Sequence, residues 1–181
     1  MDALRARRFQ RYFTALDSNE DGRLSKSDFE LAGLRYAEKL GYAAGSAEQR
    51  RLSDMSVALW TDMVSPMDTD GDGEVTYEEF WAAIEQNLGS DRADYAKVRP
   101  VIELYFTMAD SDSDGEISRE EFTTMFTTAV RVPEADVAAN FSAITAEHAE
   151  VLTLDQFHEA MAEFCYGTDP QAPANHLFGR L

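Results

Sequence analysis

Residues 68–79, DTDGDGEVTYEE, place several carboxylates at intervals that few backbones can accommodate. Aspartates hold the first, third and fifth positions, and Glu79 holds the twelfth. Alternate side chains in such a stretch point into one concavity, and the chain must then turn sharply, which the positive φ available to Gly73 permits. Because Glu79 is long enough to offer both carboxylate oxygens from the start of a following helix, the stretch predicts an oxygen-lined cation site.

The same spacing recurs along the chain as an internal repeat. It is found again in residues 17–28 and 110–121. A fourth copy, residues 145–156, has Thr145, Ala149 and Gln156 at its first, fifth and twelfth positions and Glu150 in place of the glycine. The pattern is that of the EF-hand calcium loop, which lies between two helices. We therefore expect three Ca²⁺-binding loops and an inactive fourth loop.

Apolar residues recur in step with the loops. Each loop is followed by a phenylalanine, and its eighth residue is aliphatic: Phe29, Phe80, Phe122 and Phe157, with Leu24, Val75, Ile117 and Leu152. The eighth residues can form short antiparallel bridges, so we expect the first loop to pair with the second and the third with the fourth. This pairing explains why the inactive loop is retained, because its loss would expose the apolar face of the third hand.

The repeats predict an all-α protein of four EF-hands in two pairs, packed into a compact calmodulin-like EF-hand fold with short β bridges between paired loops. Residues 1–88 are expected to form the N-terminal pair and residues 89–168 the C-terminal pair, with a bend between them. Residues 169–181 are expected to form a tail that docks on the body.

Individual residues predict where some of the helices begin and end. Ser46 followed by Gln49 predicts a capping box at the start of the second entering helix. Gly41 and Gly45 predict a break after the first exiting helix, and Pro66 predicts an end or kink just before the second loop.

The second and third loops each offer four ligand carboxylates and a backbone carbonyl at the seventh position. These expected ligands are Asp68, Asp70, Asp72, the Glu74 carbonyl and Glu79, and Asp110, Asp112, Asp114, the Glu116 carbonyl and Glu121. Without a cation, the like charges of each loop would converge unfavourably. At the ninth position, Thr76 and Ser118 are suited to hold a bridging water.

The first loop departs from the pattern at two ligand positions. Its expected ligands are Asp17, Asn19, Asp21, the Arg23 carbonyl and Asp28. Asn19 replaces a carboxylate, and Asp28 is one methylene shorter than the usual glutamate. A tighter shell lowers the preference for Ca²⁺ and could admit Mg²⁺, which requires shorter, octahedral oxygen contacts.

Composition and missing motifs exclude several functions. The formal net charge of −18 argues against binding nucleic acid or anionic lipid. No apolar run approaches the length of a membrane span, and we expect a cytoplasmic protein without a membrane anchor. No motif of a positioned nucleophile, zinc peptidase or phosphate loop is present, so we expect no enzyme.

The remaining reactive and polarisable side chains favour structural roles. Cys165 lies in an apolar stretch and is expected to be a buried thiol. His148, His158 and His176 lack partners at zinc-site spacing, so we assign them no metal. Six methionines suit either an adaptable target groove or a core, and their helical spacing favours the core: Met55, Met63, Met67, Met108, Met125 and Met161.

With its four hands, one of them inactive, its long first connection and its Pro-containing tail, the chain resembles the sarcoplasmic calcium-binding proteins, calexcitin and the bacterial calerythrin-like proteins. The resemblance implies two packed EF-hand pairs and an intracellular calcium buffer, and we expect a monomer. The alternative is a calcium sensor that opens to bind a target protein. We predict that Leu177, Phe178 and Leu181 of the tail occupy the groove between the halves, which would favour the buffer.

Overall fold

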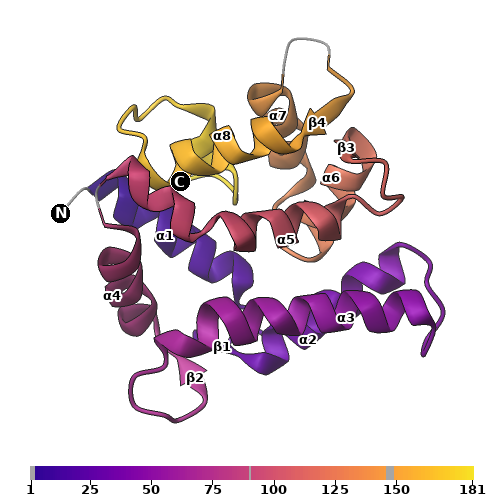
Figure 1. Ribbon diagram of the computed structural model, residues 1–181, viewed down its shortest axis with the longest axis horizontal. Helices are drawn as coiled ribbons and strands as arrows, with labels where there is room; N and C mark the ends of the chain where they lie inside the picture. The colour runs from indigo at the N-terminus through magenta and orange to yellow at the C-terminus, as the bar shows by residue number, and fades with distance from the viewer. Residues whose placement is uncertain (1–2, 90, 146–148) are drawn as a thin grey trace.

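The computed structural model describes residues 3–89, 91–145 and 149–181. Within them, eight α-helices form four helix–loop–helix units (Figure 1). The entering and exiting helices of these units are α1 (Ala3–Leu16) and α2 (Lys26–Lys39), α3 (Ala47–Leu59) and α4 (Tyr77–Leu88), α5 (Arg99–Ala109) and α6 (Arg119–Thr128), and α7 (Glu134–Ile144) and α8 (Leu154–Tyr166).

Two short antiparallel strand pairs join the loops. The strand β1 (Leu24–Ser25) pairs with β2 (Glu74–Val75), and β3 (Glu116–Ser118) pairs with β4 (Val151–Thr153). The register places Leu24 opposite Val75 and Ile117 opposite Leu152. This confirms the predicted pairing of the first loop with the second and of the third with the fourth.

The connection between the first two units is irregular at both ends. The helix α2 ends at Lys39, and α3 begins after Ser46, whose Oγ accepts a hydrogen bond from the Gln49 N–H at 3.1 Å. The Gln49 side chain accepts from the Gly45 N–H and not from Ser46, so the predicted capping box is only half formed.

Ahead of the second loop, α3 changes helical type. It runs into the π-helical turn η1 (Trp60–Val64) and then the 3₁₀ turn η2 (Ser65–Met67), which contains Pro66. Proline has no N–H to donate and its ring clashes with the preceding turn, so the α-helix cannot continue through it. Pro66 thus lies where the helical segment gives way to the loop, but the α-helix itself ends earlier, at Leu59, where the wider π-helical turn begins.

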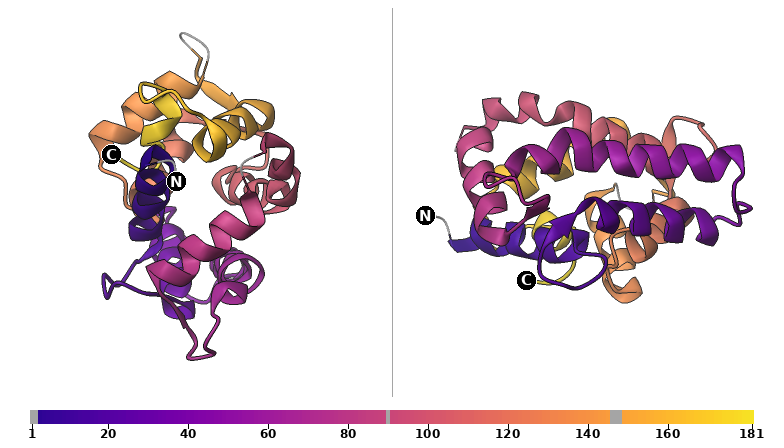
Figure 2. Two further views of the ribbon diagram at one scale, coloured as in Figure 1. Left: turned by 90° about the vertical axis from the view of Figure 1, so that its left-hand side faces the viewer. Right: turned by 90° about the horizontal axis from the view of Figure 1, so that it is seen from below.

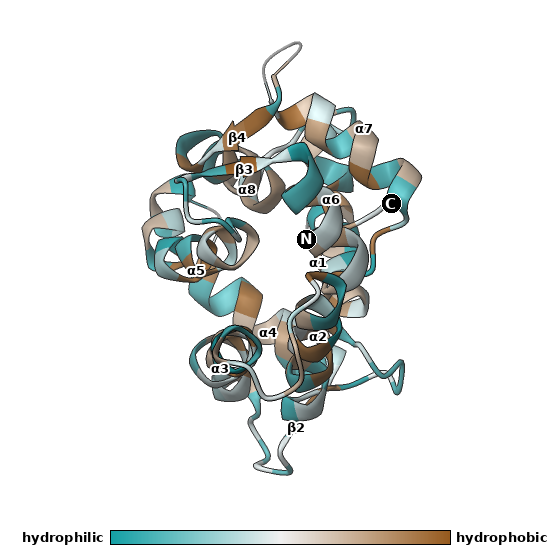
Figure 3. Cartoon of the chain, turned by 90° about the vertical axis from the view of Figure 1, so that its right-hand side faces the viewer, coloured by the Kyte–Doolittle hydropathy of each residue, from teal (hydrophilic) through white to brown (hydrophobic). Residues whose placement is uncertain are grey.

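The C-terminal half of the chain packs above the N-terminal half, with α1 running between them (Figures 1 and 2). The 3₁₀ helix η3 (Arg92–Lys97) makes the bend between the halves. Seen end-on, α2, α3 and α4 lie opposite α6, α7 and α8 (Figure 3). One continuous apolar core spans both halves.

Specific contacts tie the halves together within this core. The hydroxyls of Tyr12 and Tyr105 are 3.0 Å apart and hydrogen-bonded, and the Tyr36 hydroxyl donates to the Met108 carbonyl at 3.1 Å. The rings of Phe9 on α1 and Phe164 on α8 meet edge to face with centroids 5.4 Å apart, a favoured aromatic geometry.

A fully buried arginine on α1 caps the last helix. Arg8 is 0% exposed, and its guanidinium donates to the carbonyls of Glu163, Phe164 and Gly167 at the C-terminal end of α8. The last backbone hydrogen bond of α8 runs from the Gly167 N–H to the Glu163 carbonyl. The carbonyls at this end of a helix need partners from outside it, and the helix dipole favours a cation there. Arg8 thereby joins the N-terminal helix to the final hand.

The methionines and the cysteine lie in or against the core. Met67, Met108, Met125 and Met161 are buried, and Met55 and Met63 pack against the same cluster, as a core role predicts. Cys165 is a buried free thiol whose pKa is raised by burial to about 12, so it is protonated at neutral pH.

None of the helices in the described residues is long and apolar enough to cross a membrane.

The tail contributes two apolar side chains to the core. After the 3₁₀ helix η4 (Pro173–His176), Leu177 is 0% and Phe178 is 4% exposed. Phe178 packs on Tyr12 of the first hand, with ring centroids 4.4 Å apart, and on Phe164 of the last at 5.0 Å. Asn140 holds the segment by donating to the His176 carbonyl at 2.6 Å.

Replacing Phe178 with alanine should lower the free energy of unfolding by about 3 kcal/mol, because it removes a buried ring between the halves. Denaturant unfolding measures the change, and stronger fluorescence of a hydrophobic dye should accompany it. The control is Arg180→Ala: the Arg180 side chain is 77% exposed, and its ion pair with Asp136 should contribute little. Equal stability of the two variants would show that the tail does not support the core.

Candidate metal centres

All four loops end in the same local structure. The ninth loop residue is the N-cap of the exiting helix, and the twelfth is the third residue of that helix. In a capping box, the side chain at this third position turns back to the backbone N–H of the N-cap. The helix start therefore aims the twelfth side chain into the loop, where the helix dipole also favours negative charge.

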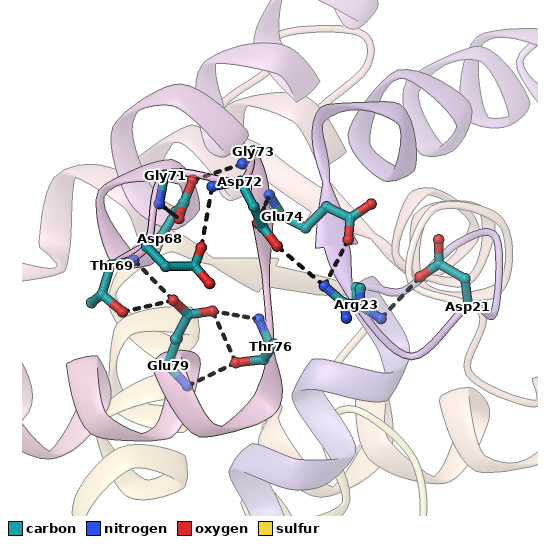
Figure 4. Close-up of polar contacts among 11 residues, drawn as sticks. Asp21, Arg23, Asp68, Thr69, Gly71, Asp72, Gly73, Glu74, Thr76 and Glu79 are labelled. Carbon is teal, nitrogen blue, oxygen red and sulfur yellow. Dashed lines mark hydrogen bonds and ion pairs between the residues drawn. The ribbon is translucent and has the colours of Figure 1, made fainter.

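In the second loop, Glu79 is held from both sides (Figure 4). One carboxylate oxygen accepts from the N–H and hydroxyl of Thr76, both at 2.9 Å. The other accepts from the N–H and hydroxyl of Thr69, at 2.9 and 2.7 Å. These hydrogen bonds, led by that from the Thr76 backbone, lower the pKa of Glu79 to about 2. The carboxylate is therefore charged at neutral pH, and its orientation is fixed.

The third loop repeats this arrangement with serines. Glu121 accepts from the N–H and hydroxyl of Ser118 and from those of Ser111, at distances of 2.8 to 2.9 Å. Burial raises the pKa of Glu121, but the hydrogen bonds from Ser118 and Ser111 outweigh it, so the pKa is lowered.

The first aspartate of each of these loops organises the turn. Asp68 accepts from the N–H groups of Gly71 and Gly73, at 2.7 and 3.0 Å. Asp110 accepts from Asp114 and Gly115, at 3.1 and 3.0 Å. The sixth-position glycines Gly73 and Gly115 have φ of +85° and +90°, where a residue with a Cβ would be strained.

Two carboxylate clusters result. Oxygen atoms of Asp68, Asp70 and Glu79 lie within 4.8 Å of one another, and those of Asp110, Asp112 and Glu121 do the same. Hard carboxylate oxygens gathered in this way suit Ca²⁺ or Mg²⁺. The structure thus brings together three of the four predicted carboxylates in each of these two loops.

The fifth-position aspartates play a different part. Asp72 and Asp114 each accept from the N–H of the seventh residue, Glu74 or Glu116, at 2.9 Å. Asp72 also faces Arg23 of the first loop, whose guanidinium lies 3.3 Å from the Asp72 carboxylate and 2.8 Å from that of Glu74 (Figure 4). Arg23 therefore faces both loops: its backbone carbonyl is an expected ligand of the first loop, and its side chain contacts the second.

The first loop gathers its side chains differently. Its twelfth residue, Asp28, is fully buried and accepts from Ser25 on one side and from the N–H of Asn19, the third residue, on the other. The longer Glu79 and Glu121 reach the second residue instead. The Asn19 amide donates to Asp21 at 2.8 Å. Among the described residues, the three-carboxylate clusters occur in the second and third loops and not here.

Two arginines from outside the first loop contact its backbone. Arg35 donates to the Ser18 carbonyl at 3.2 Å, and Arg131, from the C-terminal half, donates to the Asp17 carbonyl at 2.8 Å. Arg131 also pairs with the exposed side chain of Glu20. The expected ligand Asp17 is itself only 7% exposed. The first loop is thus attached to both halves of the molecule.

The fourth loop keeps the helix start without the ligands. Gln156 accepts from the N–H and hydroxyl of Thr153, as glutamate does in the second and third loops. An amide at this position supplies no charge. Residues 146–148 of this loop, His148 among them, lie outside the described residues.

The other histidines have structural surroundings. The Nδ1 of His158 is 2.9 Å from the Tyr95 hydroxyl, and burial lowers the pKa of His158. His176 belongs to η4, which anchors the tail. Neither is part of a carboxylate cluster in the described residues.

The hydroxyls at the second loop position were not predicted from the sequence. Thr69 and Ser111 hold the twelfth glutamate as firmly as the ninth residue does. A signal was present, because both loops that end in glutamate carry a hydroxyl residue directly after the first aspartate. The side-chain role of Arg23 left no such signal, since only the pairing of the loops creates it.

Comparisons with known proteins agree with this geometry. The family model of an EF-hand domain pair matches residues 7–85, and that of a single EF hand matches residues 102–126. Calerythrin from Saccharopolyspora erythraea is 27% identical over 168 residues, which cover 91% of this chain and 94% of calerythrin.

Solved structures show the same fold. A calcium-binding protein of Streptomyces coelicolor is 25% identical, with a TM-score of 0.72 over 91% of this chain and 99% of that one. Amphioxus sarcoplasmic calcium-binding protein is 24% identical, with a TM-score of 0.72 over 100% and 99%. The coelenterazine-binding protein of Renilla muelleri, in its calcium-loaded apo form, is 18% identical, with a TM-score of 0.83 over 99% and 97%. The chain therefore contains EF-hand domains, and the predicted likeness to calerythrin and sarcoplasmic calcium-binding protein is confirmed.

Proposed function

We propose that this protein binds three Ca²⁺ ions, in residues 17–28, 68–79 and 110–121, and acts as a cytoplasmic calcium buffer. The observation that carries the proposal is the pair of carboxylate clusters, each with a charged glutamate already fixed by hydrogen bonds to both sides of its loop. A site organised in advance loses little freedom when the ion binds.

The ligands in this proposal are those expected from the sequence. They are Asp17, Asn19, Asp21, the Arg23 carbonyl and Asp28; Asp68, Asp70, Asp72, the Glu74 carbonyl and Glu79; and Asp110, Asp112, Asp114, the Glu116 carbonyl and Glu121. The first loop, with its shorter Asp28, is the one proposed to accept Mg²⁺. The loop at residues 145–156 is proposed to be inactive.

The buried tail supports a buffer over a sensor. A sensor exposes an apolar groove for a target helix when Ca²⁺ binds. Here Leu177 and Phe178 already fill apolar space between the first hand and the last. We propose a monomer that acts by binding ions, without enzymatic activity.

The second candidate is a calcium sensor with a protein target. The solved Streptomyces coelicolor calcium-binding protein carries out calcium-mediated regulation in a prokaryote. A sensor would have to release the tail. Arg131 of the C-terminal half donates to the Asp17 carbonyl of the first loop, and this contact is a link through which an ion in that loop could act on the other half.

Calorimetric titration of the chelated protein with Ca²⁺, with and without Mg²⁺, tests the proposal. Three tight sites that Mg²⁺ competes for would support a buffer, whereas weaker, cooperative sites indifferent to Mg²⁺ would favour the sensor.

Glu79→Gln and Glu121→Gln should each remove one tight site, because the amide loses the charge and the second ligand oxygen. Unchanged stoichiometry in both variants would contradict the assigned ligands.

Replacing Arg23 with glutamine should raise the Ca²⁺ affinity of the second loop about threefold, the scale of a partly exposed ion pair. The guanidinium competes with the ion for Asp72 and lowers the negative potential of the loop. The matched control is Lys26→Gln, which removes the same charge from an exposed pair with Glu30 on α2. Equal titration curves for the two variants would exclude a specific effect of Arg23.

A further inference from the structure

A cavity of about 300 Å³ lies between the two halves. Its walls come from α1, η1, α4, α5 and α8, so neither EF-hand pair forms it alone. The interior is apolar and includes Phe9, Ile84, Ile102 and Phe164. The volume is at the lower end of the range for small-molecule sites.

Polar residues of the lining lie at the mouth of the cavity and not in its depth. Asp62, Asn87 and Lys97 line it and are exposed, whereas the apolar residues behind them are buried or partly buried. The inner hydroxyl of Tyr12 is already bonded to Tyr105 and contacts the Met63 sulfur at 3.8 Å. A charged ligand would find no partner inside, so the interior suits an uncharged, apolar molecule.

Both ends of the second calcium loop form walls of this cavity. Met67, directly before Asp68, and Phe80, directly after Glu79, line it. The corresponding residues of the first loop, Leu16 and Phe29, and of the third, Ala109 and Phe122, are not among its described walls. An ion in the second loop would therefore act on two walls of the cavity through adjacent residues.

The chain before this loop is also part of the wall. Asp62 and Met63 of the π-helical turn η1 line the cavity, and so does Met67 at the end of η2. A π-helical turn is less regular than an α-helix and is often found at functional sites. No rigid α-helix therefore separates the cavity from the loop.

We propose that this cavity binds a small, uncharged, apolar molecule, and that this molecule and a Ca²⁺ ion in residues 68–79 increase each other's affinity. The coupling is expected to be positive because a single conformation has both an open cavity and clustered oxygens of Asp68, Asp70 and Glu79. Two ligands that select the same conformation increase each other's affinity by the same factor. The coupling rests on the proposed calcium site, whereas the cavity site does not.

The test uses the full chain and the neutral fluorophore N-phenyl-1-naphthylamine. Ala83 lines the cavity on α4, and its neighbour Ala82 is exposed. Ala83→Phe should fill the cavity and abolish saturable fluorophore binding, Ala83→Leu should weaken it, and Ala82→Phe should leave it unchanged. Circular dichroism and thermal melting of each variant show whether it is folded. Absence of binding to the wild type, or equal binding to folded Ala83→Phe, would overturn the site.

The coupling is tested by repeating the fluorophore titration in Ca²⁺ and in chelator. Affinity should rise at least fivefold with Ca²⁺, in the wild type and in Glu121→Gln but not in Glu79→Gln. An unchanged affinity, in protein whose second loop binds Ca²⁺ by calorimetry, would overturn the coupling alone. If calorimetry finds no Ca²⁺ in that loop, the proposed function and the coupling both fail, and the Ala83 variants still decide the cavity site.

Discussion

Chelation of Ca²⁺ is expected to lower the free energy of unfolding by about 8 kcal/mol relative to protein in Ca²⁺ at a thousandfold excess over the dissociation constants of the second and third loops. Each occupied loop contributes about 4 kcal/mol at that ratio, because the ion binds the folded loop and not the unfolded chain. Without the ion, the clusters at Glu79 and Glu121 retain converging like charges. Denaturant unfolding in Ca²⁺ and in chelator measures the difference.

Single-loop variants make this prediction specific. Glu79→Gln and Glu121→Gln should each lose about half of the calcium-dependent stabilisation, and the double variant should lose nearly all of the share from these two loops. In chelator, each variant should be less stable than the parent, because the amide loses the charge-assisted hydrogen bonds that lower the pKa of the glutamate. Identical unfolding curves for the parent in Ca²⁺ and in chelator would contradict metal binding by these loops.

Replacing Arg8 with alanine is expected to lower the free energy of unfolding by about 4 kcal/mol, the scale for losing several charge-assisted hydrogen bonds and leaving buried acceptors unpaired. The variant would remove the arginine donor from the buried Phe164 carbonyl and the partly buried Gly167 carbonyl, leave the Glu163 carbonyl with only the Gly167 N–H, and open a gap between α1 and α8. Denaturant unfolding in saturating Ca²⁺ measures the loss, so that metal binding does not confound it.

The adjacent arginine is the matched control. Arg7 is exposed on the same helix, and Arg7→Ala should change stability by less than about 0.5 kcal/mol. Arg8→Lys should fall between the two, because an ammonium keeps the charge but not the planar fork that spans separate carbonyls. Similar losses for Arg7→Ala and Arg8→Ala would refute the capping role.

Much of the fold followed from short-range pattern. The capping of Glu79 and Glu121, the turn at Gly73 and the bridges at Leu24–Val75 and Ile117–Leu152 all depend on residues within one loop or on the repeat of that loop. Such features recur whenever the spacing recurs, because hydrogen bonding and steric limits act on neighbours in the chain.

The candidate ligands were predicted in the same way, but their grouping was not. Nothing in the pattern distinguishes Asp72 from Asp70, yet Asp72 faces Arg23 while Asp70 joins the cluster. Asp114 is left out of the third-loop cluster in the same way, and both aspartates accept from the N–H of the seventh residue. The pairing of the loops adds the contact of Asp72 with Arg23 but does not decide the grouping. The half-formed cap at Ser46 has a local cause, since the N–H of the adjacent Gly45 donates to the Gln49 side chain.

Local spacing in the sequence was sufficient for the four hands, their pairing and the carboxylates that gather in the second and third loops, because each requires only a few consecutive residues in a defined order. Contacts between distant segments depended on how the two halves pack. Arg8 reaches α8 across 156 residues of sequence, Phe178 meets Tyr12, and the apolar cavity opens between α1, α4, α5 and α8. These features follow from side-chain shape and volume in a shared core, which no repeat in the sequence encodes.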